Sequence, residues 1–310
     1  MPIPSGLGRL RLPAIAAPLF LISDPDLVVA TCNAGVTGTF PSLNQRSAEG
    51  LSDWLSEIES RLAPDAAPHG VNLIMHRSNP RLEADLAVVV RHRVPLVITS
   101  LGAAREVVDA VHSYGGLVFH DVISRRHAEK AAEAGVDGIV CVAAGAGGHT
   151  GLMSPFALLA EIREIFDGCL ILSGAITTGA HIAAARLMGA DLAYLGTRFI
   201  ASHEAHAQPA YKQMLVDSRM ADILHTDRIS GVPANFLVPS IVRAGLDPEN
   251  LPAHQKLDVT AEARAWRDVW SAGHGVGGIR GIQPVAEICA QLMREYAAAM
   301  ARAESDPFRP

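Results

Sequence analysis

One histidine of this chain follows a run of small residues, and that setting favours catalysis. His149 comes directly after residues 144–148, which read Ala-Gly-Ala-Gly-Gly. The small side chains leave open space beside the imidazole, where a flat ring could lie or a substrate could reach the ring nitrogen. Histidine titrates near neutral pH and can accept and return a proton there. We therefore predict that His149 is an acid/base group, whereas the commoner role of a single histidine is a structural hydrogen bond.

Two further segments share one design, in which an apolar run leads into a turn of small residues. Residues 170–176 read Leu-Ile-Leu-Ser-Gly-Ala-Ile, and residues 192–198 read Leu-Ala-Tyr-Leu-Gly-Thr-Arg. Glycine lets the backbone approach a ligand closely, and free amides at the start of a helix favour an anion. Barrel enzymes commonly bind phosphate at the loops after strands seven and eight. Either turn alone is more often an ordinary glycine turn, but the pair predicts a phosphate site. Its residues are Gly174, Ala175, Gly196 and Thr197.

The elements that must position these residues are short apolar runs that alternate with helix-patterned segments. Several runs are nearly continuous in Val, Ile and Leu, as in strands buried on both faces of a parallel sheet. We expect eight strands, at residues 14–17, 36–40, 70–74, 96–99, 117–122, 138–141, 170–172 and 192–195. Their alternation with helices favours a closed (β/α)8 TIM barrel, an α/β fold, with an open doubly wound sheet as the alternative.

Apolar residues at three- and four-residue spacing predict the intervening helices. Such segments include residues 52–62, 104–113, 126–134, 155–165 and 180–188. A glycine follows three of them, at Gly115, Gly135 and Gly189, where a left-handed residue ends a helix at low cost. The units around Asp137 and Asp191 are alike, because in each a helix, a glycine, an aspartate and a strand follow in that order.

The pattern changes after Phe199. Residues 203–265 are polar, helical in pattern and rich in proline and histidine, with no strand of comparable strength. We expect residues 201–265 to form a small, mainly helical inserted domain. The barrel domain would then comprise residues 1–200 plus 266–302, and a last amphipathic helix at 285–301 would complete it.

Composition and charge exclude several classes of protein. The chain has 310 residues, of which 49% are hydrophobic and 19% charged, so it can fill a large core. A net charge of −6 without any Lys/Arg run argues against a nucleic-acid partner. No apolar run is long enough to span a bilayer, and the first ten residues do not read as a signal peptide. We expect a cytoplasmic protein with no membrane partner.

The sequence predicts neither a disulfide framework nor a metal site. The cysteines are scattered and form no C-x-x-C pair; they are Cys32, Cys141, Cys169 and Cys289. His120 and Asp121 are adjacent on a predicted strand, so their side chains should point to opposite faces. His203 and His206 are three residues apart on a predicted helix, but no third ligand is obvious.

These motifs together resemble the nitronate monooxygenase family, formerly called 2-nitropropane dioxygenases. That family also includes FMN-dependent enoyl-acyl-carrier-protein reductases and related NADH:quinone reductases. The resemblance covers about residues 8–200 and returns at 266–302. The matching stretches are residues 16–19, 32–35, 71–73, 146–151, 173–176, 195–199 and 270–273.

The resemblance implies FMN as the cofactor and assigns roles to individual residues. Ala17 and Pro18 would pass under the flavin ring, and Asn72 would bond near its pyrimidine edge. His149 would remove a proton from the carbon that bears a nitro group. The full set of implied cofactor-binding residues is Ala17, Pro18, Leu19, Asn72, Ser100, Gly148, Ser173, Gly174, Ala175, Gly196, Thr197, Ser271 and Gly273.

The reaction that the resemblance implies is the oxidation of alkyl nitronates by O2 to a carbonyl compound and nitrite. An NAD(P)H-dependent reductase of an enone, an enoyl thioester or a quinone is the alternative, and a flavin-free isomerase or lyase of a phosphorylated metabolite is a third. Residues 142–145 are apolar or small where the family has a polar residue, and His274 stands where the family has Gln. Both departures bear on the substrate pocket. We expect a small-molecule substrate, and the sequence leaves a homodimer open.

Overall fold

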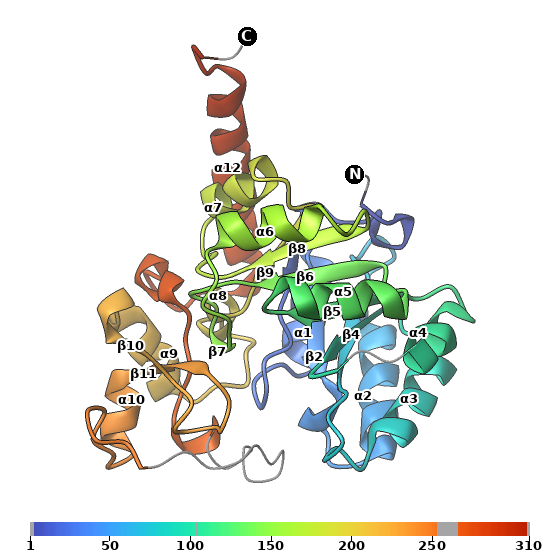
Figure 1. Ribbon diagram of the computed structural model, residues 1–310, viewed down its shortest axis with the longest axis horizontal. Coiled ribbons are helices and arrows are strands. Elements are labelled where there is room, and N and C mark those ends of the chain that lie inside the picture. The colour runs from blue at the N-terminus through green and yellow to red at the C-terminus, as the bar shows by residue number, and fades with distance from the viewer. Residues whose placement is uncertain (1–2, 103–104, 253–265, 309–310) are drawn as a thin grey trace.

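The computed structural model describes residues 3–102, 105–252 and 266–308, and within them eight parallel strands close into a barrel surrounded by helices (Figure 1). Strand β1 pairs in parallel with β9, through Ala14↔Ala193 and Ala16↔Leu195, so the sheet has no open edge. The TIM barrel prediction is therefore confirmed, and the open sheet is excluded. The strands are β1 (Ala14–Ala16), β2 (Thr37–Pro41), β3 (Gly70–Ile74), β4 (Leu96–Ser100), β5 (Leu117–Val122), β6 (Gly138–Val142), β8 (Cys169–Ser173) and β9 (Leu192–Leu195).

Several helices begin or end at residues with suitable capping chemistry. The side chains of Asp24, Ser47 and Thr178 each accept a hydrogen bond from a first-turn amide. Gly135 ends a helix with φ of 88°, the left-handed conformation that the sequence predicted there. The helices are α1 (Pro25–Asn33), α2 (Ala48–Arg61), α3 (Leu82–Arg91), α4 (Arg105–His112), α5 (Arg125–Ala134), α6 (Pro155–Arg163), α7 (Gly179–Leu187), α8 (Thr197–Ile200), α9 (Pro209–Asp217), α10 (Val238–Arg243) and α12 (Val285–Glu304).

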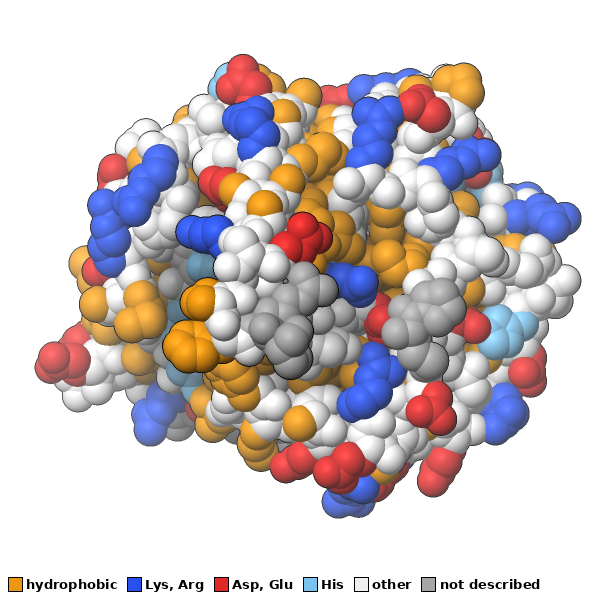
Figure 2. Space-filling model, turned by 90° about the horizontal axis from the view of Figure 1, so that it is seen from above, with side chains coloured by type: hydrophobic (Ala, Val, Ile, Leu, Met, Phe, Trp, Pro, Cys, Tyr) orange, Lys and Arg blue, Asp and Glu red, His pale blue; other side chains and the backbone are white. Residues whose placement is uncertain are grey.

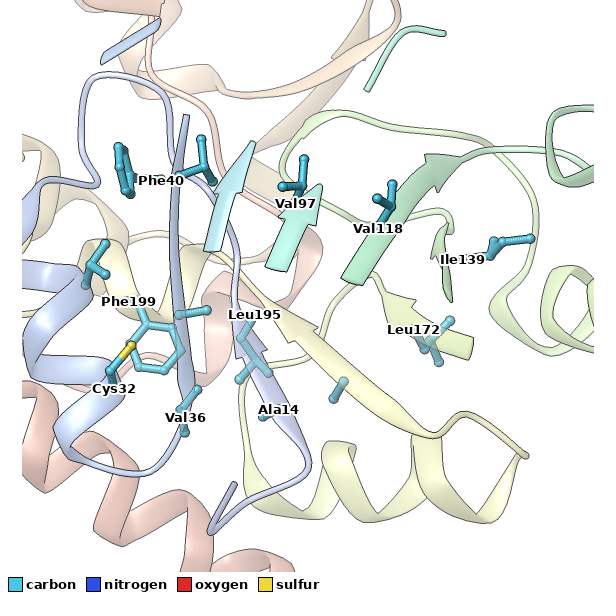
Figure 3. Close-up of a cluster of buried hydrophobic side chains, with 14 of the residues drawn as sticks. Ala14, Cys32, Val36, Phe40, Val97, Val118, Ile139, Leu172, Leu195 and Phe199 are labelled. Atoms are coloured by element: carbon cyan, nitrogen blue, oxygen red, sulfur yellow. The ribbon is translucent and has the colours of Figure 1, made fainter. Parts of the chain in front are cut away.

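Alternate residues of most barrel strands enter two different cores, which explains the nearly continuous apolar runs. Ile98, Phe119 and Ile171 belong to the cluster that fills the barrel interior. Their neighbours Val97 and Val118 belong to the larger cluster between strands and helices. Figure 3 shows this outer cluster, in which Phe40, Ile139, Leu172 and Leu195 also take part.

The repeated unit around Asp137 and Asp191 has a structural meaning. The carboxylate of Asp137 accepts a hydrogen bond of 2.8 Å from the Val118 amide, and that of Asp191 accepts one of 2.9 Å from the Leu170 amide. Each aspartate thus ties the start of its own strand to the start of the preceding barrel strand. Arg163 pairs with Asp191 at 2.9 Å. The repeat stabilises the end of the barrel where the strands begin.

The segment after the barrel strands contains strands that the sequence analysis did not predict. In addition to α9 and α10 it holds β10 (Ile223–Thr226) and β11 (Ala234–Leu237), which pair antiparallel. Strand β11 also pairs with β7 (Gly148–His149), the short strand that follows β6 and carries the predicted acid/base group. The last part of the predicted inserted domain, residues 253–265, lies outside the described residues, and the domain bounds remain a prediction.

Helix α12 packs against α7 and α1, and its far end extends well beyond the barrel (Figure 1). The approach of α12 to α7 is close, because a Cβ on Gly179 would lie 2.0 Å from the Leu292 carbonyl oxygen. No helix of the described ranges combines the length and the apolar character needed to cross a bilayer. Acidic and basic side chains are interspersed over the face shown in Figure 2, with hydrophobic side chains between them.

Candidate active site

A cavity of about 1140 Å³ opens at the carboxyl ends of the barrel strands, where barrel enzymes place their sites. Its wall includes residues from strand ends, from the loop around His149 and from the segment beyond β9. Pockets for one small ligand usually measure roughly 300–1,000 Å³. This cavity therefore has room for a cofactor and a substrate together.

The structure brings every predicted site residue to this cavity or to a recess beside it. The cavity wall includes His149 together with Ala17, Pro18, Leu19, Asn72, Ser100, Gly148, Ser173, Gly196, Thr197 and Ser271. A recess of about 20 Å³ is lined by the other three, Gly174, Ala175 and Gly273. Ser173, Gly196 and Thr197 line both spaces, so the recess adjoins the cavity.

Four turns that are far apart in the sequence meet at the recess. The Gly145 carbonyl oxygen accepts hydrogen bonds from the amides of Ala175 (3.2 Å) and His274 (2.9 Å). The Thr197 hydroxyl oxygen accepts one of 2.9 Å from the Gly273 amide. The turns after β6, β8 and β9 and the segment before α12 thus hold one another in place.

Gly174 and Gly273 have a structural reason that the sequence did not suggest. Each lies where one turn packs closely against the backbone of another. A Cβ on Gly174 would lie 2.9 Å from the Ala144 carbonyl oxygen, and one on Gly273 would lie 2.5 Å from that of Gly145. Atoms that close must shift, and backbone cannot easily do so. The neighbour of a Cβ on Gly196 would be the Leu19 side chain, at 3.2 Å. Gly174 and Gly273 are therefore needed for the packing of the turns, and the positive φ of Gly174, 134°, also favours glycine.

The recess presents hydrogen-bond donors that the protein does not use. Among the described residues, the amides of Gly174, Gly196 and Thr197 donate to no protein acceptor. The Ala175 amide donates to the Gly145 carbonyl oxygen. Gly174, Gly196 and Thr197 are each partly exposed, so these amides can donate to an acceptor atom that enters the recess. Outward-facing amides beside a short turn form the concave surfaces that bind anions. The residues present thus fit a phosphate group, with three of the four predicted turn residues supplying free donors.

His149 is held at the cavity wall by a sheet and by an aromatic ring. As part of β7 it pairs with Ala234 of β11. The neighbouring Gly148 amide donates a hydrogen bond of 2.7 Å to the Ser271 hydroxyl. The imidazole packs edge-on against the Trp266 ring, with centroids 5.5 Å apart. The position of the imidazole is therefore set by three segments of the chain.

The loop before His149 is anchored as well. The Asn235 side-chain amide donates a hydrogen bond of 2.7 Å to the Ala146 carbonyl oxygen, and the Thr150 hydroxyl donates one of 2.9 Å to that of Ala143. Since Asn235 belongs to β11, the segment beyond the barrel holds the loop that the barrel provides. Sequence patterns gave no signal for Asn235.

The sequence analysis missed a polar layer inside the barrel mouth. The Asn72 side-chain amide donates to the Ser100 hydroxyl (2.7 Å), which in turn donates to the Asp121 carboxylate (2.6 Å). Burial raises the pKa of Asp121 to about 6. Within the described ranges the buried Tyr194 hydroxyl has no hydrogen-bond partner, and burial raises its pKa. The period of two along β5 and β9 was the signal that could have identified both residues.

His120 and Asp121 point in different directions, as predicted. The His120 Nδ1 lies 2.7 Å from the Thr99 hydroxyl, on the outer side of the strands. Burial lowers the pKa of His120 to about 4, so its imidazole is neutral at pH 7. Among the described residues, no group of three metal-ligating side chains occurs.

The two departures from the family pattern have different positions. Val142 lines the cavity, as does Phe20, whereas His274 is outside it and packs against Gly145. Phe236 is fully buried and stacks on the Trp266 ring at 5.0 Å. The apolar residue at Val142 therefore changes the cavity wall directly. The histidine at position 274 can affect the cavity only through its contact with the turn at Gly145.

Comparisons with known proteins agree with this geometry. The sequence model of the nitronate monooxygenase family matches residues 74–295. The chain belongs to the nitronate monooxygenase family. A nitronate monooxygenase of Paraburkholderia phytofirmans is 28% identical to it, over 91% of this chain and 92% of that protein. Family membership makes the protein an oxidoreductase with flavin-dependent relatives.

Other similar proteins carry different names. A 5-hydroxy-7a-methyl-1-oxo-octahydro-1H-indene-4-carboxyl-CoA dehydrogenase of Rhodococcus jostii is 25% identical, over 75% of this chain and 64% of that protein. The solved nitroalkane oxidase of Streptomyces ansochromogenes has a TM-score of 0.84 and 26% identity, and covers 96% of this chain and 100% of its own. FabK of Thermotoga maritima, with a TM-score of 0.81, 24% identity and 97% of each chain covered, shows the shared fold.

Proposed function

We propose that the protein is an FMN-dependent nitronate monooxygenase, which oxidises alkyl nitronates with O2 to a carbonyl compound and nitrite. The observation that supports this most is the recess of unpaired amides at Gly174, Gly196 and Thr197, directly beside the cavity that His149 lines. These amides would hold the FMN phosphate, and FMN when bound would supply the electron chemistry. Ala17, Asn72 and the remaining predicted residues of the wall would bind the rest of the cofactor.

In this proposal His149 acts as the base. Its imidazole is fixed by β11 and by the Trp266 ring, and His149 lines the cavity beside the small residues that precede it. When the substrate enters as the neutral nitroalkane, His149 would take the acidic proton from the carbon that bears the nitro group and hold it at a ring nitrogen, which leaves the nitronate for oxidation. A positioned base of this kind contributes roughly 10²–10⁴-fold to a rate.

An NAD(P)H-dependent reductase is the second candidate, and the cavity favours it. The volume of about 1140 Å³ is larger than a cofactor and a short nitroalkane would need. Val142 makes the wall apolar where nitronate monooxygenases have a polar residue. The similar Rhodococcus jostii protein is named for a CoA ester. A bulky enone or enoyl thioester would suit such a cavity.

One experiment separates the two candidates. The purified protein would be mixed without oxygen, first with NADH and then with an alkyl nitronate, while the visible absorbance of the flavin is followed. We expect bleaching by the nitronate only. Fast bleaching by NADH would establish the reductase instead, and a colourless protein that releases no flavin on denaturation would contradict both.

Replacing His149 tests its role. We expect His149→Ala to keep its FMN but to lose about 10²–10⁴-fold in turnover of nitroalkane, because no base then reaches the substrate carbon. The matched control is His206→Ala, a histidine at the same cavity whose side chain is 79% exposed. Its turnover should stay within about twofold of the wild type. Normal turnover of His149→Ala would remove the residue from the mechanism.

A further inference from the structure

A buried carboxyl group at the barrel mouth has no part in the function proposed above. Asp121 is the second-last residue of β5, and its side chain points into the barrel, where the Ser100 hydroxyl donates to its Oδ2 atom at 2.6 Å. The other oxygen, Oδ1, is buried and has no hydrogen-bond partner in the described part of the chain. Asp121 also lines the main cavity, together with Asn72 and Ser173 from the predicted cofactor site.

The hydrogen bonds that lead to Asp121 have a fixed direction. The Asn72 side-chain nitrogen donates to the Ile98 carbonyl oxygen at 3.1 Å and to the Ser100 oxygen at 2.7 Å. A hydroxyl has one hydrogen, and since Ser100 already accepts from Asn72, that hydrogen is free to point to Asp121. Asp121 is thus the acceptor at the end of the chain, which suits an ionised carboxylate.

No cation balances this carboxylate within the described residues. Ser100 faces it from β4, Val140 and Val142 on β6 are apolar, and Tyr194 faces it from β9. His120, its neighbour on β5, is directed to Thr99 and is neutral at pH 7. Lys130 and His127 of α5 lie at the cavity wall, and no ion pair joins either of them to Asp121. The charge of Asp121 is therefore sensitive to any new charge in the cavity.

We propose that Asp121 takes up a proton when the cofactor in this cavity is reduced, so that the carboxylate and the reduced ring are not charged together. The inference rests on the proposed flavin. A flavin ring that gains two electrons and one proton carries one additional negative charge. The reductant supplies the electrons, and bulk water supplies a second proton, which converts the Asp121 carboxylate to a carboxylic acid.

The pKa of Asp121 supports this assignment. Burial raises it to about 6, so at pH 7 the group is mostly ionised but close to its titration point. A like charge in the same low-dielectric site raises the pKa of a carboxyl further. Reduction of the cofactor at pH 7 would therefore carry Asp121 across its titration point, whereas exposed carboxylates would stay ionised.

Sulfite is a suitable probe, because its addition to an oxidised flavin leaves a negative charge on the ring without any turnover. We expect Asp121→Asn to bind sulfite at least about tenfold more tightly than the wild type at pH 8, since the neutral amide keeps the Ser100 bond but removes the charge. At pH 5 the two proteins should agree within about threefold. Asp53→Asn, at an exposed position of α2, is the matched control and should equal the wild type.

Two measurements extend the test to proteins that keep Asp121. In the wild type at pH 8, photoreduction should produce an infrared carboxylic-acid band that is missing in Asp121→Asn. Ser100→Ala should move the pH at which sulfite affinity changes upward, because the Ser100 hydrogen bond lowers the pKa of Asp121. Equal sulfite affinities at pH 8 and no such band would overturn the inference while leaving FMN binding intact. A protein that binds no FMN would overturn the proposed function as well.

Discussion

A carboxyl group that lines a cavity changes the stability of a protein with pH even before a ligand binds. The folded-state pKa of Asp121 is about 6, compared with 3.8 for an ordinary aspartate. A raised folded-state pKa gives stability that is complete below pH 3.8 and is lost as the pH rises through 6. The wild-type protein should therefore lose stability over this window through Asp121.

Asp121→Asn should remove that loss. We expect the free energy of unfolding of the cofactor-free variant to exceed that of the wild type by about 1–2 kcal/mol at pH 8, because each pKa unit corresponds to 1.36 kcal/mol and cavity water reduces the effect. At pH 4 the difference should vanish. Urea titrations at both pH values measure it, and a difference that does not depend on pH would contradict the stated cause.

Individual site residues were predictable from the sequence where the neighbouring residues formed a distinctive pattern. The small residues before His149 and the paired turns at Gly174 and Gly196 led to one cavity and its recess. The reason for the glycines was not predictable, because the close contact of Gly273 with Gly145 joins residues far apart in the chain. Asp121 was expected only to point away from His120 at the end of its strand, so its place in the polar layer was missed.

At the scale of elements, Asp137 and Asp191 allow a direct comparison, because they occupy equivalent positions in two repeated units. Asp191 is 4% exposed and Asp137 is 28% exposed, although both accept from a strand amide. We expect Asp191→Ala to lower the free energy of unfolding by about 3 kcal/mol, because it leaves the buried Leu170 amide without its acceptor and removes the carboxylate that pairs with Arg163. Asp137→Ala should cost only about 1 kcal/mol. Denaturant titration of both variants measures this, and equal losses would show that burial does not decide the effect.

The barrel strands were predictable because buried parallel strands read as apolar runs, and β3, β5 and β9 have the predicted bounds. The strands β10 and β11 were not predictable in the same way. Each has four residues, and β10 is only half-buried and includes polar His225 and Thr226. The pairing of β11 with β7 depends on a contact between residues about 85 positions apart, which no local pattern reveals.

At the scale of the whole molecule, a bound cofactor should stabilise the fold, because it would contact segments from both halves of the chain. The recess joins turns at residues 145–147 and 174–177 to residues 273–275. FMN at about a hundredfold excess over its dissociation constant would stabilise the folded state by about 2.7 kcal/mol. We expect removal of FMN to lower the melting temperature by roughly 4 °C, because the unfolding entropy of a chain of this length is about 0.65 kcal/mol per kelvin. An unchanged melting temperature would mean that FMN does not bind the folded protein at this site.

The pairing of β7 with β11 has a consequence for how such proteins diversify. His149 belongs to the barrel part of the chain, but Ala234 and Asn235 of β11 fix the position of the loop that carries it. Exchange of residues 201–252 between relatives would therefore reposition the proton acceptor while the eight-stranded scaffold and its anion recess stay as they are. In this architecture the segment of residues 201–252 would determine the range of substrates, and the barrel would determine the affinity for the cofactor.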